Sequence, residues 1–275
     1  MQLDRPIAYG RTAEIYPWEG GWVLKLFHTW FPSEAVQYEA IAARAVYVAG
    51  LPVPAVGEII EVDGRMGLLY QRVKGISMWE QLQAKPWKTF EYARILAELH
   101  AQMHAVVIPA DRQPQPPEQR NKLVEKLNAA KGLSERLHQA ALDELANLPA
   151  GDRLCHGDFH PGNVLMTPDG MMIIDWIDVT VGSPLADVAR TSVLALGAAA
   201  TVTGPGARLQ KWTIRSFHWV YINRYFQLMP GGQAEYHRWM PVVAAARMSE
   251  GIAELQEWLH DQARRGLQKK DLSEP

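Results

Sequence analysis

The residues best suited to chemistry lie in one segment, HGDFHPGNVLMTPDGMMIIDW, which runs from His156 to Trp176. Asp158 and Asn163 stand five residues apart in a stretch with Gly and Pro, and Asp175 follows twelve residues later, after the apolar run MMII. A carboxamide and a carboxylate supply the hard oxygen ligands that Mg²⁺ prefers, and Mg²⁺ shares its coordination shell with phosphate oxygens. If the apolar run folds back beside the loop, Asn163 and Asp175 can hold this ion together.

Asp158 would then be a free carboxylate near the metal, and its natural role is to accept the proton of an attacking hydroxyl. Phosphoryl transfer needs this arrangement, because its catalysis consists mainly of positioning and charge neutralisation. A single aspartate in a loop is more often a turn or capping residue. The coincidence of D-x4-N, an apolar strand and a closing aspartate is what favours a catalytic interpretation.

The segment resembles the catalytic loop of the aminoglycoside phosphotransferase family, which are small-molecule kinases with a protein-kinase-like fold. In that family an H-G-D-x4-N loop precedes a strand that ends in I-D-W. The resemblance implies that Asp158 is the catalytic base and that Asn163 and Asp175 bind Mg²⁺, with ATP as the phosphate donor. The matching positions of this chain are His156, Gly157, Asp158, Asn163, Ile174, Asp175 and Trp176.

Two further residues are expected to support this loop. The stretch GSPLADVAR resembles the family's G-x-P-x-x-D motif, with Asp187 at the position of its aspartate. We expect Asp187 to anchor the catalytic loop from the protein interior. His156 is expected to order the loop through its ring. Protein kinases carry H-R-D and D-F-G here, whereas this chain has Gly157 and Trp176 in place of the Arg and Phe. Without that arginine, we expect no switch driven by an activation-loop phosphate.

The resemblance extends to the first part of the chain. Lys25 in VLKLF occupies the family's position for the lysine that contacts the ATP phosphates, and Glu39 in QYEAI can pair with it from the following helix. A flexible ammonium group near phosphates must be held by a carboxylate, which explains the need for such a pair. Taken singly, a surface lysine or a helical glutamate is common, so both assignments depend on the other motifs.

The remaining nucleotide contacts are backbone groups. YGRTAEIY contains no G-x-G-x-x-G motif, so its residues could give N–H groups to phosphate oxygens or form an ordinary hairpin turn. By resemblance, LLYQRVKG is the hinge, with the carbonyl of one residue and the amide of another facing adenine. These expected ATP-binding residues are Gly10, Arg11, Thr12, Gln71 and Val73.

The elements that must position these groups divide at residue 73. Before it, the pattern predicts three strands, a helix at 33–48 and two strands joined by an Asp63-Gly64 turn. After it, helices dominate, apart from a hairpin with TPDG as its turn. The predicted helices lie at 87–106, 122–148 (one or two helices), 185–200, 207–228 and 234–267, with a Pro-rich connection at 108–120.

This order predicts an α+β, two-lobed, protein-kinase-like fold. Residues 1–73 form the N-terminal nucleotide-binding lobe, a small antiparallel sheet with one helix. Residues 74–275 form the large, mainly helical C-terminal lobe, which carries the catalytic loop and the substrate site.

Composition narrows the partners and the compartment. The net charge is −2 and the chain lacks a basic field, so we expect neither a nucleic acid nor a membrane as a partner. The small-apolar stretch at 193–203 is too short to span a bilayer. The single cysteine, Cys155, excludes an internal disulfide and fits a reducing cytosol. The start MQLDRPIAYG does not read as a secretory signal, so we expect a cytoplasmic protein.

Three other interpretations stay open. His156, Asp158 and His160 alternate like ligands in a metal-dependent hydrolase, but the sequence has no second cluster of His or Cys at ligand spacing. The second is a non-catalytic nucleotide-binding module of the same fold. The presence of Lys25, Asp158, Asn163 and Asp175 argues against a loss of activity. Cys155 as a nucleophile is the third, and a small buried residue is the simpler interpretation.

The resemblance implies a hydroxyl of a small molecule as the phosphate acceptor. The resemblance implies aminoglycosides, choline, ethanolamine, amino sugars or homoserine. A polycationic aminoglycoside needs carboxylates, and a choline-type substrate needs an aromatic cage. The candidate substrate residues are Asp178, His160, Glu250 and Glu254, with Glu257 and Asp261 along the same predicted helix face as the last two. A solvated acidic face explains these glutamates equally well. Aromatic candidates are Trp212, Trp219, Tyr221, Tyr225, Trp239 and Trp258.

Overall fold

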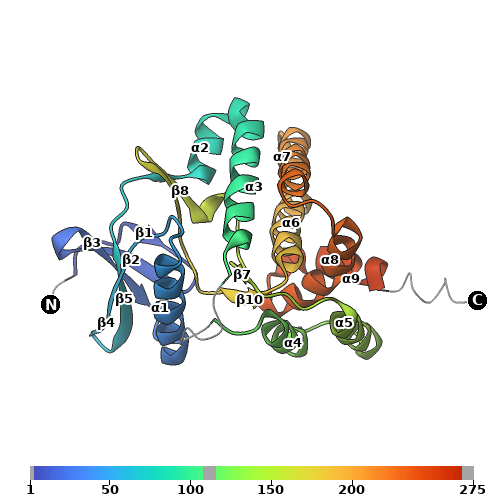
Figure 1. Cartoon of the computed structure of the whole chain (residues 1–275), viewed down its shortest axis with the longest axis horizontal. Helices are drawn as coiled ribbons and strands as arrows, with labels where there is room; N and C mark the ends of the chain where they lie inside the picture. Colours follow the sequence, from blue (N-terminus) through green and yellow to red (C-terminus); the bar gives the residue numbers. More distant parts are fainter. Residues whose placement is uncertain (1–2, 108–115, 268–275) are drawn as a thin grey trace, which may run out of the picture. The chain divides into compact units, whose positions relative to one another are not determined.

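The computed structural model describes residues 3–107 and 116–267, which form two compact units (Figure 1). Of the described residues, the first unit comprises 3–81, residue 116 and Pro161–Val179, and the second comprises Leu82–Val107, Pro117–His160 and 180–267. Most of the predicted Pro-rich connection, up to residue 115, lies outside the described residues. Among the helices that the structure describes, none has the length and apolarity needed to cross a bilayer.

A five-stranded antiparallel sheet forms the body of the first unit, in the order β1-β2-β3-β5-β4. The Asp63-Gly64 turn joins its last two strands as predicted, with φ of 51° and 75° at the two residues, the left-handed values of a tight hairpin turn. The strands are β1 (Ala8–Tyr9), β2 (Ala13–Trp18), β3 (Trp22–Phe27), β4 (Val56–Val62) and β5 (Arg65–Gln71). The short helix η1 (Glu19–Gly21) connects β2 to β3.

Helix α1 (Ser33–Val48) packs across β4 and β5 (Figure 1). Its Val36 and Ala40 join Phe27 and Leu68 of the sheet in one buried cluster. The cluster fixes α1 against the sheet, and this contact sets the position of Glu39 on the same helix. The predicted helix range is confirmed.

A second, three-stranded sheet in the first unit carries the hairpin of the candidate catalytic segment. Its order is β6-β8-β9, and the predicted TPDG turn is confirmed between Thr167 and Gly170. Because β6 pairs with β8, the hairpin packs with the first unit, although it lies far beyond residue 73 along the chain. The elements are β6 (Ile76–Ser77), η3 (Pro161–Asn163), β8 (Val164–Thr167) and β9 (Gly170–Ile173).

Helices make up most of the second unit. Helix α3 (Thr89–Ala105) and helix α7 (Ala207–Leu228) lie side by side (Figure 1). Strands β7 (Arg153–Cys155) and β10 (Thr180–Gly182) form a two-stranded antiparallel pair, and the candidate catalytic segment lies between them in the sequence. The other elements are η2 (Pro86–Lys88), α4 (Gln119–Ala129), α5 (Glu135–Asn147), α6 (Pro184–Thr201), α8 (Gln233–Arg247), η4 (Met248–Glu250) and α9 (Ala253–Leu267). Helix α2 (Met78–Ala84) spans the chain boundary between the units.

The prediction of one continuous helix over 234–267 is wrong. Helix α8 ends at Arg247 and α9 begins at Ala253, with η4 between them. Gly251 has φ of 65°, a left-handed value that ends a helix at little steric cost in glycine. Glu250 therefore lies in η4, and it does not share a continuous helix face with Glu254.

Candidate active site

The first unit brings three of the predicted site residues into contact. Lys25 Nζ lies 2.7 Å from Glu39 Oε1 and 2.7 Å from Asp175 Oδ1. Lys25 is in β3, between β2 and β5, and Glu39 reaches it from the buried face of α1. Asp175 follows β9 directly in the chain. A buried ammonium group is thus held between two carboxylates that come from separate elements.

Charge pairing keeps this lysine protonated. Burial alone would lower the pKa of Lys25, but the charges of Glu39 and Asp175 outweigh it and raise the pKa above the usual value. Burial raises the pKa of Glu39, and the charge of Lys25 opposes that rise. Tyr70 in β5 donates a hydrogen bond to Glu39 Oε1 at 2.8 Å. We did not predict a role for Tyr70, because its partner is thirty-one residues away in the sequence.

The two predicted metal ligands meet at one end of the β8–β9 hairpin. The backbone N–H of Ile174 donates to the carbonyl of Asn163 at 3.0 Å, which places Asp175 close to Asn163. Asp175 adopts φ of 67°, a left-handed conformation that is uncommon outside glycine. Such strain is often found at functional sites, and here it turns a 39% exposed carboxylate toward Lys25.

The proposed base lies in the second unit. Asp158 Oδ1 accepts a hydrogen bond from Arg190 Nη2 at 3.1 Å, and Asp158 Oδ2 lies 3.5 Å from His160 Nε2. Burial acts to raise the pKa of Asp158. The hydrogen bond from His160 and the charge of Arg190 more than offset it and hold this pKa well below the usual range. Asp158 is therefore ionised at neutral pH.

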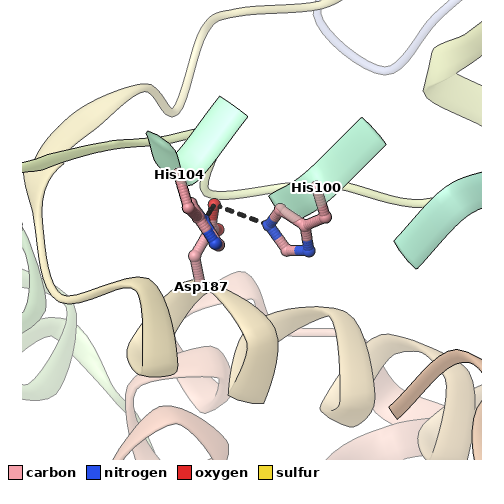
Figure 2. A group of neighbouring side chains, drawn as sticks. All are labelled: His100, His104 and Asp187. Carbon is pink, nitrogen blue, oxygen red and sulfur yellow. Dashed lines mark hydrogen bonds and ion pairs between the residues drawn. The ribbon is translucent and has the colours of Figure 1, made fainter. Parts of the chain in front are cut away.

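Asp187 contacts the backbone of the same loop. Its carboxylate accepts the N–H of His156 at 2.6 Å and the N–H of Gly157 at 2.8 Å. Both histidine rings of α3, His100 and His104, approach Asp187 Oδ2 through Nε2 at 3.1 and 3.3 Å (Figure 2). These are the contacts that the predicted anchoring role requires.

The two α3 histidines are themselves held by α7. The Tyr221 hydroxyl lies 2.6 Å from His100 Nδ1, and the Tyr225 hydroxyl lies 2.8 Å from His104 Nδ1. Sequence reasoning missed both histidines as functional residues. The available signal was their spacing of four residues on a buried helix face, which places both rings on the same side of α3.

The three groups of Figure 2 also have the composition of a metal site. Their candidate ligand atoms lie within 4.8 Å of one another. Each of the two Nε2 atoms already contacts Asp187 Oδ2, and that oxygen also accepts a backbone N–H. A metal ion would have to displace these hydrogen bonds in a fully buried cluster. We therefore interpret the cluster as a hydrogen-bonded anchor for the loop.

Acid is expected to destabilise the fold through His100. Burial, with a contribution from the charge of His104, lowers the pKa of His100 to about 3, whereas an unfolded histidine titrates near 6.5. Below pH 6.5 the unfolded chain binds a proton that the native state excludes, so stability present above that pH is lost as the pH falls. The loss approaches about 1.4 kcal/mol per pH unit once the unfolded histidine is fully protonated. Burial lowers the pKa of His218 to about 4, which acts in the same direction.

Urea unfolding measured at several pH values between 5 and 7 checks this expectation. The free energy of unfolding should decrease on acidification, and the slope should be smaller in His100→Gln by about one proton. Equal slopes in the wild type and in this variant would contradict the assignment of a neutral, buried His100.

The other residues predicted to contact the nucleotide lie in or next to the five-stranded sheet of the first unit. The N–H of Gly10 donates to the carbonyl of Ala13 at 2.8 Å, so the Gly10–Thr12 segment forms the turn between β1 and β2. The Gly10 amide is thus already used within the turn, which favours the simple hairpin alternative for that residue. Gln71 ends β5, and Val73 follows two residues later.

The candidate substrate residues fall into different environments. Glu250 pairs with Arg190 and Arg247, so its charge is matched within the protein. Glu254 is exposed on α9. Burial raises the pKa of the Tyr38 hydroxyl, and the nearby charge of Asp178 raises it further. Of the aromatic candidates, Trp212 and Trp219 are exposed, whereas Tyr221, Tyr225 and Trp239 are buried in the core and so are not available to line an open cage.

Comparison with known proteins identifies the family. The model of the Phosphotransferase enzyme family (APH) matches residues 8–221, which include Lys25, Glu39, Asp158 and Asp175. The chain belongs to this family. A search of curated proteins finds no match.

Solved structures support the fold assignment. An aminoglycoside phosphotransferase APH(4)-Ia variant, in a ternary complex with ADP and hygromycin B, has 17% identity and a TM-score of 0.64, covering 97% of this chain and 93% of the other. A choline/ethanolamine kinase family protein from Mesorhizobium loti has 19% identity and a TM-score of 0.59, with 100% and 89% coverage. An aminoglycoside-3'-phosphotransferase of type VIII has 20% identity and a TM-score of 0.61, with 90% and 92% coverage. The predicted two-part α+β fold of small-molecule kinases is confirmed.

Proposed function

We propose that this phosphotransferase moves the γ-phosphoryl group of ATP to a hydroxyl of a small molecule, in a Mg²⁺-dependent reaction. The observation that carries the proposal is the buried Lys25 ammonium group between Glu39 and Asp175, both at 2.7 Å. An ammonium group that is charged, buried and oriented by two carboxylates suits the binding of phosphate oxygens. The ADP named in the APH(4)-Ia complex supports a nucleotide as the donor.

Asn163 and Asp175 are the residues that would hold Mg²⁺. The donor set fits this ion, because a carboxamide and a carboxylate supply oxygen ligands and both residues lie at one end of the hairpin. When bound, Mg²⁺ neutralises the charge that develops on the phosphate oxygens. Lys25 supplies a second positive charge from the protein itself, and Glu39 keeps that charge in place.

Asp158 orients the acceptor hydroxyl and takes its proton. The hydroxyl oxygen forms the new bond to the γ-phosphorus, the bond from that phosphorus to the bridging oxygen breaks, and ADP leaves with the electron pair. The low pKa of Asp158 makes it a weak base in the ground state. Its main contribution is therefore to align the hydroxyl, and the proton moves as the new bond to phosphorus forms.

Removal of the Lys25 charge should weaken nucleotide binding. We expect Lys25→Met to raise the Kd for Mg·ATP about tenfold or more, since a hydrogen bond to a charged group contributes about 1.5–3 kcal/mol. Isothermal titration calorimetry measures this change. Lys88→Met is a matched control, because it removes a partly exposed lysine that pairs with Glu91 outside the site. An unchanged Kd in Lys25→Met would contradict the phosphate-binding role.

The acceptor class is a choice between aminoglycosides and small alcohols such as choline, ethanolamine or homoserine. Glu254, Asp178 and His160 are the candidates for contacting the acceptor, and the two carboxylates would suit a cationic one. A screen of ATP consumption against aminoglycosides, choline, ethanolamine, homoserine and sugar amines decides between them. GTP in parallel reactions tests the choice of donor.

Two measurements separate this proposal from the other classes. A non-catalytic nucleotide-binding module would bind Mg·ATP, and melt at a higher temperature with it, but would phosphorylate no acceptor. A metal-dependent hydrolase would purify with stoichiometric zinc. The contacts of His156 argue against the hydrolase, because its Nδ1 accepts the N–H of Asp158 at 3.3 Å and is engaged within the loop.

A further inference from the structure

Arg190 of α6 contacts the catalytic loop at two points. Its Nη2 lies 3.1 Å from Asp158 Oδ1, and its Nε donates to the carbonyl of Gly157 at 3.1 Å. The same Nη2 lies 2.6 Å from Glu250 Oε1. With its side chain only 11% exposed, Arg190 has little freedom to move away from these partners. One guanidinium group thus holds both the backbone and the side chain of the loop.

Glu250 is held in turn by a second arginine. Its Oε2 lies 3.2 Å from Arg247 Nε, and Arg247 Nη1 donates to the carbonyl of Val193 at 3.2 Å. The four charged side chains alternate in sign from Asp158 through Arg190 and Glu250 to Arg247. Each of these charges therefore has a partner of opposite sign, which offsets the free-energy cost of removing it from water. Glu250 makes its contact with Arg190 from η4, where the helix is interrupted between α8 and α9.

We propose that Arg190, held by Glu250, is a positioning residue that fixes the Asp158 carboxylate for phosphoryl transfer. This inference rests on the proposed function. In the structure, Asp158 Oδ1 is hydrogen-bonded to Arg190, and Asp158 Oδ2 faces His160 Nε2. A base held in one orientation presents the same oxygen to each acceptor hydroxyl, which is what proximity catalysis requires.

Lysine cannot replace this arginine fully. The guanidinium group is planar and its donors diverge, so it reaches the Gly157 carbonyl and both carboxylates at once, whereas an ammonium group acts as a compact point charge. Among the described residues, the charged and titratable groups around Asp158 include Arg190 of α6, Glu250 of η4, Arg247 of α8, and the loop histidines His156 and His160.

The first readout needs no acceptor. Isotope-labelled aspartate carboxyl carbons are followed by NMR in the ligand-free protein, and Asp158 is assigned from the resonance that disappears in Asp158→Asn. In Arg190→Gln, we expect the titration midpoint of Asp158 to rise by about one to two pH units, because an opposite charge at this distance lowers a carboxyl pKa by about 1–3 units. Arg190→Lys should show a smaller rise.

The second readout is the division between kcat and KM. With an acceptor from the screen, Arg190→Gln should lower kcat at least tenfold and leave the KM for ATP within twofold, and Arg190→Lys should recover part of the loss. Glu250→Gln should also lower kcat, since Arg190 then loses its second anchor. Arg224→Gln is the matched control, because it removes an arginine that makes two hydrogen bonds to Glu98 elsewhere in the second unit.

The combined outcomes decide the inference. A raised midpoint together with a reduced kcat supports it, and an unchanged value of either one overturns it. If Arg190→Gln does not fold, Arg190→Lys and Glu250→Gln are judged by the same criteria. If the wild type phosphorylates no acceptor, the proposed function fails, whereas the midpoint of Asp158 still reports whether Arg190 holds that carboxylate.

Discussion

Asp158→Asn is expected to lower kcat by about 10²- to 10⁴-fold, the usual contribution of a positioned base. Asparagine has nearly the same shape as aspartate, and its amide oxygen can still accept the hydrogen bond from Arg190 Nη2. The substitution therefore removes the charge and the proton acceptor while the loop keeps its conformation. The affinity for Mg·ATP should stay within twofold, because Lys25, Glu39 and Asp175 are unchanged.

Steady-state kinetics and calorimetry on the same preparation check both parts of this prediction. Asp143→Asn provides a matched control, since it removes an exposed aspartate of α5 that accepts a hydrogen bond from Gln139. Its kcat should equal that of the wild type. An Asp158→Asn variant with half or more of the wild-type turnover would show that Asp158 is not the base.

Asp187→Asn is expected to destabilise the protein by about 3–5 kcal/mol, the cost of breaking a buried charged network. The Asp187 carboxylate accepts two backbone N–H groups and contacts two histidine rings. An asparagine would present its NH₂ group to some of these donors and leave them unpaired in the core. Activity should fall as well, because the His156 and Gly157 amides lose the group that fixes the loop.

Urea denaturation gives the stability change, and hydrogen exchange at the His156 and Gly157 amides reports the loop directly. Both amides should exchange faster in the variant. Ser192→Ala is a control in the same helix, where it removes a buried hydroxyl that hydrogen-bonds Tyr236, at an expected cost of about 1 kcal/mol. If Asp187→Asn cost no more than this control, Asp187 would not be the anchor of the loop.

Local patterns predicted much of the fold. The ranges of α1 and α7 match the predicted ones, and the strands of the first sheet follow in the predicted order, because alternation, turn residues and helical spacing are all contained in short windows of sequence. The error at 234–267 arose because apolar spacing continues across Gly251, whose left-handed backbone ends η4 and separates α8 from α9. That error also placed Glu250 on the wrong element.

The candidate site divides in the same way. Asp158, Asn163 and Asp175 were predicted as site residues because their motif lies within a single segment of the sequence. Lys25 and Glu39 were predicted by resemblance, and their contact is visible only in the structure. Tyr70, His100 and Arg190 were not predicted, since the hydrogen-bond partner of each lies 31, 87 or 32 residues away in the sequence. A network formed by tertiary packing leaves no fixed spacing in the sequence.

The most direct test of the account is to follow the phosphoryl group itself. Purified protein is incubated with ATP, Mg²⁺ and an acceptor from the panel, and mass spectrometry then measures phosphorylated acceptor and ADP. We expect one phosphoryl group on the acceptor hydroxyl, equal amounts of both products, and loss of both with Asp158→Asn. Binding of Mg·ATP with no phosphorylated acceptor from any class in the panel, or equal product from Asp158→Asn, would contradict the account.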